Sequence, residues 1–232
     1  GNAGVNNSCV AGSVYYPDII ISKGMYGMHI QHKVQYLGVN SVSDELHNGY
    51  KYRQSLYMSE QNTHQWFETS LGQYLINNEQ RYFDQVVANI FGYNAVQVGL
   101  PQFNFLQLNR MPLQFTIGSE TGASLLAKAD FLPIKSNSMD LVIMPHILEF
   151  HHNPHQLLRE AHRILIPEGH IVISGFNPFS LWGTCQYIKS RKCNFPWNGN
   201  FIALPRLKDW LKLLNFEMSG GKLCCYAPPF KQ

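Results

Sequence analysis

The stretch "MDLVIMPHILEFHHNPHQLLREAHRILIPEGHIVIS", residues 139–174, decides the fold class of this 232-residue chain. Two short apolar runs without alternation, 141–144 and 170–174, are typical of strands that are buried on both faces of a parallel sheet. Between these runs, Asn153 can cap a helix that Pro167 to Gly169 can end. The stretch therefore predicts a strand–helix–strand unit.

The same alternation of elements extends over the chain from residue 63 onward. Apolar residues recur at helical spacing from Thr63 to Phe91, and Gly92 is a stop signal. Further elements are expected as strands at 95–98, 113–117, 125–129 and 216–226 and as a helix at 204–214. This pattern predicts an α/β domain over residues 63–232 with a doubly wound, mostly parallel sheet. Residues 1–62 are expected to form a small N-terminal appendage of unknown role.

Composition indicates a folded protein without specialised cysteine chemistry. Hydrophobic residues make up 45% of the chain, charged residues 14%, and the five cysteines show no Cys-x-x-Cys spacing. These features argue against a disulfide framework and a zinc knuckle. No run of 18 apolar residues and no signal-peptide pattern occurs, so we expect a cytoplasmic protein without a membrane partner.

The charge is distributed unevenly along the chain. The net charge is +3, but residues 185–232 hold 8 Lys and Arg against 2 Asp and Glu, whereas residues 1–184 hold 10 against 13. A basic region of this kind can attract a phosphorylated or nucleic-acid partner through its long-range field. It is more commonly a solvated helical face that keeps a protein soluble.

The candidate site lies where the predicted strands end, because ligands of doubly wound sheets bind beyond the carboxyl ends of the strands. Gly99 allows a close backbone approach, although Pro101 removes an N–H donor from the same loop. Glu120 and Asp130 supply carboxylates that could hold hydroxyl or amino groups. A lone glycine after a strand is also typical of an ordinary turn.

Residues 128–180 resemble the central part of class I S-adenosylmethionine-dependent methyltransferases of the small type-11 kind. The motifs follow in the order of that family: Asp130, Leu132–Ile134, Asp140–Val142, His151–Pro154 and Glu160–Gly169. The resemblance runs from about Thr63 to the end, and "GFNPFSLWG" and "WLKLLNFE" are similar to an uncharacterised bacterial subgroup. It implies a Rossmann-like fold, S-adenosylmethionine as cofactor, and methyl transfer to a small-molecule, phosphorylated or nucleic-acid acceptor.

The resemblance also assigns a cofactor loop after the first strand of the sheet. In the family an acidic residue precedes a Gly-x-Gly-x-Gly loop that lies against the methionine end of the cofactor. The matching positions here are Gln97, Gly99, Leu100 and Pro101, so only the first glycine is kept. We therefore expect weaker cofactor binding than a glycine-rich loop gives.

Further site residues follow from the same resemblance. Glu120 lies near the position of the acidic residue that holds the ribose hydroxyls, and Ala129 and Asp130 match the position that contacts the adenine amino group. Pro145 and His146 match the wall of the methyl-transfer site. His146 is the candidate general base, because the pKa of histidine lies near working pH, although a strand-end histidine can also merely cap backbone groups.

Other functions are less well supported by the sequence. The histidines near residue 150 lack the spacing of a zinc motif, so no metal is expected. The sequence contains neither the Gly-x-Gly-x-x-Gly motif of a dinucleotide dehydrogenase nor the Gly-x-Ser-x-Gly motif of an α/β-hydrolase, which disfavours both functions. The alternative that stays open is a non-catalytic binding or scaffold protein on the same fold, with a degenerate cofactor loop.

One strand of the family sheet has no counterpart near the end of the sequence. In the family, a last antiparallel strand is inserted between the fifth and sixth strands, whereas this sequence ends about where the sixth strand finishes. An unfilled position would leave an unpaired edge. Either a C-terminal hairpin is missing, or a strand from the N-terminal segment, at Ile19–Ser22 or Val34–Leu37, fills the position.

Overall fold

The structure is a computed structural model that describes residues 14–16, 21–23, 65–119, 122–189, 196–220 and 222–224. Glu120 and the strand expected at Val34–Leu37 lie outside these residues.

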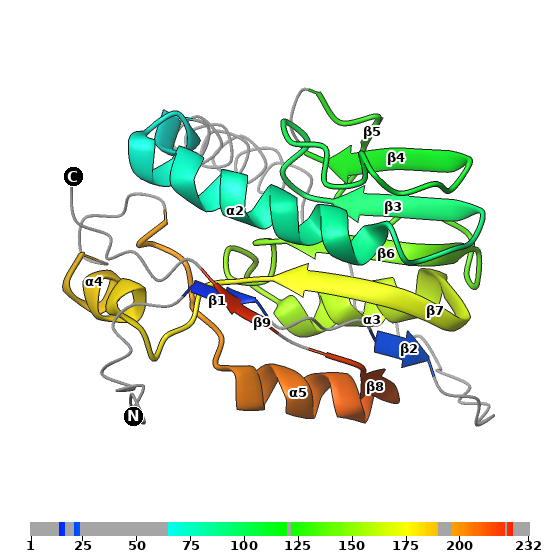
Figure 1. Ribbon diagram of the computed structural model, residues 1–232. Coiled ribbons are helices and arrows are strands. Elements are labelled where there is room, and N and C mark those ends of the chain that lie inside the picture. The colour runs from blue at the N-terminus through cyan, green and yellow to red at the C-terminus, as the bar shows by residue number, and fades with distance from the viewer. Residues whose placement is uncertain are drawn as a thin grey trace, which may run out of the picture.

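A seven-stranded sheet forms the centre of the structure, in the order β5–β4–β3–β6–β7–β2–β8 (Figure 1). Its strands are β5 (Leu125–Leu126), β4 (Leu113–Gly118), β3 (Asn94–Val98), β6 (Met139–Pro145), β7 (Leu165–Ser174), β2 (Ile21–Lys23) and β8 (Phe216–Met218). All pairs from β5 to β7 are parallel. The predicted α/β fold with a mostly parallel sheet is therefore confirmed. The edge where these parallel strands end is called the carboxyl rim below.

Strand β2 fills the antiparallel position near the far edge of the sheet. Ile21 lies opposite Ile171 of β7 and opposite Met218 of β8, and both pairings are antiparallel. Figure 1 shows β2 running in the direction opposite to β7. The hypothesis that the segment Ile19–Ser22 supplies this strand is confirmed for Ile21 and Ser22, the described strand extends to Lys23, and part of the expected appendage therefore belongs to the central sheet.

The strand expected at 216–226 is divided between two sheets. It forms β8 and, after a break, β9 (Lys222–Cys224), which pairs antiparallel with β1 (Val14–Tyr16) in a separate two-stranded sheet. Gly220 lies between the two strands, and glycine gives the backbone the freedom to leave a strand. The prediction of one continuous strand was wrong.

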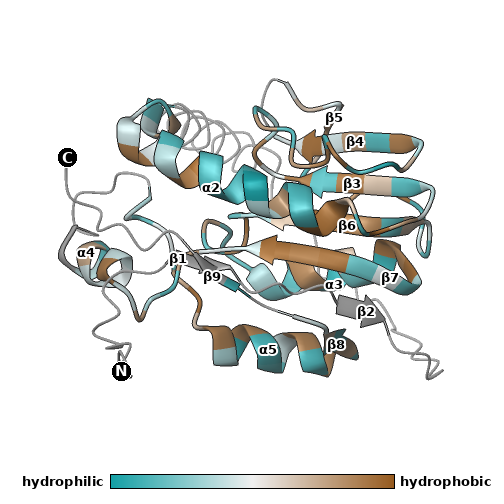
Figure 2. Ribbon diagram, viewed as in Figure 1, coloured by the Kyte–Doolittle hydropathy of each residue, from teal (hydrophilic) through white to brown (hydrophobic). Residues whose placement is uncertain are grey.

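Helices cover both faces of the sheet. Helix α2 (Ser70–Val87) crosses one face, and α3 (Pro154–Ile164) and α5 (Leu204–Leu213) lie on the other, while α4 (Leu181–Lys189) lies beyond the carboxyl rim (Figure 1). Strand β6 contributes side chains to the hydrophobic cores on both faces of the sheet. Leu141 and Ile143 belong to the core under α2, and Val142 and Met144 belong to the core under α3. The apolar colour of β6 and β7 in Figure 2 agrees with burial on both faces. Among the described residues, no helix combines the length and hydropathy that a membrane span requires.

Two helix boundaries differ from the sequence prediction in informative ways. Thr69 caps α2 by accepting a hydrogen bond from the Gly72 N–H at 3.1 Å, so the expected helix from residue 63 is interrupted before Gly72. Asn153 caps α3 as predicted, accepting the Gln156 N–H at 3.2 Å. However, α3 ends at Ile164 and β7 starts at once, so Pro167–Gly169 lie inside a strand. An irregular pairing with β6 between Met139 and Leu141 accommodates them.

The pairing of β2 leads to the first testable prediction. We expect Ser22→Pro to lower the free energy of unfolding by about 2 kcal/mol, because proline removes an N–H from a strand that is paired on both sides. Urea denaturation measures the change. Ser22→Ala keeps the N–H and is the matched control, and equal stability of the two variants would contradict the pairing.

Candidate functional site

Gln97 shapes the loop that follows β3. Its side chain is fully buried, and its Nε2 donates to the carbonyl oxygens of Gly99 (3.1 Å), Leu100 (3.0 Å) and Phe103 (2.8 Å). Its Oε1 accepts the N–H of Phe105 at 3.0 Å. One amide therefore holds four backbone groups and closes the loop around itself. Gln97, which was predicted to bind cofactor, acts on the loop from inside and does not lie on the rim surface.

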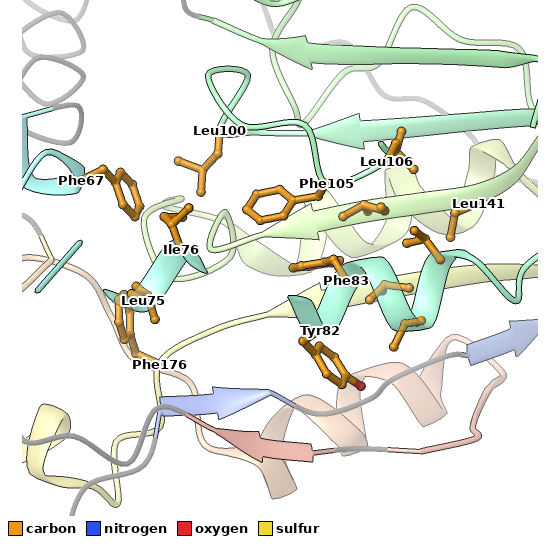
Figure 3. Close-up of a cluster of buried hydrophobic side chains, with 14 of the residues drawn as sticks. Phe67, Leu75, Ile76, Tyr82, Phe83, Leu100, Phe105, Leu106, Leu141 and Phe176 are labelled. Carbon is orange, nitrogen blue, oxygen red and sulfur yellow. The ribbon is translucent and has the colours of Figure 1, made fainter. Parts of the chain in front are cut away.

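The loop begins with two residues in the left-handed region. The φ angles of Gly99 and Leu100 are +96° and +45°, and the Gly99 N–H donates to the carbonyl oxygen of Ile117 at 2.9 Å. The Leu100 side chain is buried in the core beneath α2 and points toward Phe67 and Ile76 (Figure 3). The side chain of Leu100 is therefore a core element, and only its backbone is left to contribute to the predicted cofactor loop.

The connection between β3 and β4, residues 99–112, consists of turns and loops and contains no helix. Its aromatic residues pack beneath α2 instead. The Phe105 ring lies 4.6 Å from the Phe83 ring, and the Phe103 ring lies 5.2 Å from the Phe67 ring, measured between centroids. Core packing on α2 and on the segment just before it thus accounts for both rings. It also follows that no helix N-terminus adjoins Gly99 to attract an anion.

The tips of β3 and β6 lie against each other at the carboxyl rim. A Cβ on Gly99 would lie 3.3 Å from Cδ1 of Ile147 and 3.6 Å from the carbonyl oxygen of Pro145. The structure therefore brings the predicted residues Gly99 and Pro145 together. Because Gly99 has a left-handed backbone and lies close to Ile147, a side chain at this position would strain the loop and crowd Ile147 at the tip of β6.

Asp130 follows β5 and lies beside the connection between β6 and α3. Its Oδ2 lies 4.0 Å from Nε2 of His151, and both side chains are partly exposed. Nδ1 of His151 accepts the Asn153 N–H at 3.1 Å, so the neutral ring carries its proton on Nε2, which faces the carboxylate. Burial lowers the pKa of His151, which keeps the ring neutral at pH 7. Ala129 packs partly against the α3-side core, and the carboxylate of Asp130 stays accessible.

His152 joins Asp130 and His151 in a group whose potential metal-ligating atoms lie within 4.8 Å of one another. A metal ion at Nε2 of His151 would need a free lone pair on that nitrogen. The hydrogen bond from Asn153 to Nδ1 instead places the proton on Nε2. The local hydrogen bonding therefore disfavours a metal ion at this nitrogen.

Arg163 on α3 anchors the segment that follows Asp130. Its guanidinium donates to the carbonyl oxygens of Leu132 at 2.9 Å and Ile134 at 2.8 Å. Glu160 pairs with Arg163 at 2.8 Å and accepts the Leu132 N–H at 3.1 Å. The Glu-x-x-Arg pattern of the sequence thus holds the segment next to the Asp130 carboxylate.

His146 lies in a buried cluster of charged groups. Its Nε2 is 2.5 Å from Oε1 of Glu79 on α2, and its Nδ1 is 3.4 Å from Oε1 of Glu149. Burial by itself lowers the pKa of His146, but the two carboxylates outweigh this effect and raise it to about 10. A protonated ring with both nitrogens engaged cannot accept a proton. The general-base role expected for His146 therefore does not fit this geometry.

Sequence reasoning missed Glu79 as a partner of His146. Glu79 lies on the buried stripe of α2, between Ile76 and Tyr82, and it is fully buried. A carboxylate on an apolar helical stripe is rarely buried without a partner. This pattern was the signal that could have found it.

Comparison with known proteins gives one family match and several relatives. Residues 78–173 match the family model described as "Methyltransferase domain". A 102-residue segment is 41% identical to the uncharacterized protein YafS of Escherichia coli K12 and covers 43% of this chain and 42% of YafS. The match thus spans less than half of that relative.

Two solved structures share the fold. A SAM dependent methyltransferase from Archaeoglobus fulgidus has a TM-score of 0.51 at 18% identity, over 65% of this chain and 71% of that one. The YcgJ protein from Bacillus subtilis has a TM-score of 0.51 at 10% identity, over 60% of this chain and 68% of that one. The resemblance of the sequence to class I S-adenosylmethionine-dependent methyltransferases is confirmed by the family match over residues 78–173, and the two solved structures show that the fold is shared.

Proposed function

We propose that the protein transfers a methyl group from S-adenosylmethionine, which would lie across the carboxyl rim. The observation that carries this proposal is the juxtaposition of Gly99, in left-handed conformation, with the tip of β6 at Pro145 and Ile147. The accessible carboxylate of Asp130 at the same rim supports it. Asp130 would accept a hydrogen bond from the adenine amino group, and the backbone at Gly99 would border the methionine end.

The residues at the rim suit a reaction that depends on alignment. When bound, S-adenosylmethionine supplies an electrophilic methyl group on a good leaving group, so the protein chiefly has to orient the reactants and exclude water. Pro145 and Ile147 supply an apolar wall beside Gly99 for this purpose. The protonation of His146 is compatible with this chemistry, because an acceptor without a proton to lose requires no general base.

The loop after β3 sets an expectation for affinity. Pro101 offers no N–H, the Gly99 N–H is already bonded to Ile117, and no helix begins after the loop. The methionine carboxylate therefore has fewer backbone donors than a Gly-x-Gly-x-Gly loop followed by a helix would provide. We propose that the cofactor binds with modest affinity and is held chiefly by its adenosine part.

Asp130→Ala tests this placement directly. We expect the variant to bind S-adenosylhomocysteine at least about tenfold more weakly, because a hydrogen bond to a charged group contributes about 1.5–3 kcal/mol. Isothermal titration calorimetry measures the change. Asp209→Ala, which removes an exposed carboxylate on α5, is the matched control and should leave the affinity unchanged.

The same titration separates the proposal from its alternative. Absence of binding by the wild-type protein at millimolar ligand would favour a non-catalytic scaffold on this fold. Binding that Asp130→Ala leaves unchanged would place the adenine elsewhere.

A further inference from the structure

We propose that Glu79, His146 and Glu149 form a buried charged clamp that positions the wall of the methyl-transfer site. The clamp acts through Ile147, the neighbour of His146 that contacts Gly99. This inference rests on the proposed function, and it makes the three residues positioning residues that touch neither cofactor nor acceptor.

The clamp joins the tip of β6 to α2, to the residue after β7 and to the loop at Asn200. Glu79 comes from α2, and only 0%, 2% and 3% of the surfaces of Glu79, His146 and Glu149 are exposed. The carboxylate of Glu149 also accepts the N–H of Phe176, just after β7, and its carbonyl oxygen accepts the Asn200 N–H at 2.7 Å. The His146 and Phe176 rings lie 4.4 Å apart. Movement at the tip of β6 would therefore disturb contacts with several elements at once.

The backbone at the tip of β6 needs such support. His146 has a φ angle of +48°, a left-handed conformation that costs free energy for a residue with a Cβ. Its N–H donates to the carbonyl oxygen of Ser174 at 3.0 Å, and its ring is held from both sides by Glu79 and Glu149. These contacts determine the direction in which the chain leaves the strand. They thereby determine where Ile147 meets Gly99.

The charge balance of the clamp points to a role beyond packing. A single histidine faces two carboxyl groups in a buried place, so the cluster holds more acidic than basic groups. Within the described part of the chain, Oε2 of Glu79 and Oε2 of Glu149 have no hydrogen-bond partner. Well-packed apolar side chains would fill the same space at no such cost in desolvation. We infer that this cost is retained because the charged contacts hold the strained tip of β6 in one geometry.

The first experiment compares ligand affinity with stability. We expect His146→Gln to weaken the binding of S-adenosylhomocysteine at least tenfold in calorimetric titrations. The matched control is Asp140→Asn at the opposite end of β6, where Oδ2 of Asp140 accepts the N–H groups of Tyr93 and Asn94 at 3.0 and 2.9 Å. The control lowers stability at a distance from the rim and should leave the affinity within about twofold.

The second experiment uses an isosteric variant and a pH profile. Two charged groups face the His146 ring, Glu79 from α2 and Glu149 from the connection after β6, while β7 is followed by the Phe176 ring. Glu79→Gln keeps a hydrogen-bond acceptor but removes one charge that holds the proton on His146. The loss of affinity at high pH should therefore begin at least one pH unit lower than in the wild type. The amino group of the ligand titrates alike in all variants, so the difference reports on His146.

The outcomes distinguish the clamp from the proposed function. If the wild type does not bind S-adenosylhomocysteine, the proposed function itself is wrong. If the wild type binds and His146→Gln binds equally well, or if Glu79→Gln leaves the pH profile unshifted, the clamp does not position the site. A comparable loss of affinity in Asp140→Asn would show that the loss in His146→Gln comes from general destabilisation, and it would also overturn the inference.

Discussion

His146→Gln is expected to lower the free energy of unfolding by about 3–5 kcal/mol, the range found when one partner of a buried ion pair is removed. The change takes away the only cation between the buried carboxylates of Glu79 and Glu149 in the described structure. Chemical denaturation at pH 7 measures it. His152→Gln, at an exposed position, is the control and should change stability by less than about 0.5 kcal/mol.

The pH dependence of this effect has a definite sign. The pKa of His146 is about 10 in the folded protein and 6.5 without perturbation. A raised pKa means that the folded state holds the proton more tightly, so its contribution is fully present below pH 6.5 and is lost as pH rises toward 10. The stability difference between wild type and His146→Gln should therefore shrink over this window. A difference independent of pH would show that the ring is not charged in the folded state.

Gln97→Glu is expected to be strongly destabilising, on the order of 4 kcal/mol, because it buries a carboxyl group whose only hydrogen-bond donor among the described residues is the Phe105 N–H. The Nε2 of Gln97 donates to three carbonyl oxygens, which would then face an acceptor. An ionised carboxylate here is repelled by all three. We expect the loop after β3 to lose its shape, and binding of S-adenosylhomocysteine with it.

The control for this change repeats the substitution at a less buried site. Nε2 of Gln114 also donates to two backbone carbonyls, those of Asn109 and Met111, at 2.8 and 3.1 Å, but Gln114 is exposed. Gln114→Glu should cost about 1 kcal/mol or less, since water can solvate the introduced charge. Thermal and urea denaturation of both variants measure the difference. Equal costs would contradict the role given to Gln97.

The fold was predictable where the sequence pattern is local. The apolar runs of β6 and β7 and the cap at Asn153 identified the strand–helix–strand unit, because each signal lies within a few residues of the structure that it specifies. The boundary at Pro167–Gly169 was misread for the same reason. Proline and glycine usually end helices, but here the strand begins before them and pairing with β6 carries it across an irregularity.

The candidate site was predictable only in part. Strand topology was sufficient to bring Gly99 and Pro145 to one rim, since Gly99 follows β3, Pro145 ends β6, and the two parallel strands are neighbours in the sheet. The protonation state of His146 was not predictable from the residues next to it in the sequence. Its pKa depends on Glu79, which belongs to a different element and comes close only when α2 packs on the sheet. The role of Gln97 was not predictable either. Its hydrogen bonds form only when the loop after β3 folds back on the strand, so the family resemblance alone pointed to a cofactor-binding residue.

The position of β2 between β7 and β8 has a consequence for synthesis on the ribosome. The segment that forms β2 emerges well before its partners on either side, because β7 begins only at Leu165 and β8 only at Phe216. Until then β2 has no partner in the sheet, and such an unpaired segment invites wrong pairing between nascent chains. The native pairing of β2 should therefore form late, and slowing elongation before β8 has emerged should increase the tendency to aggregate.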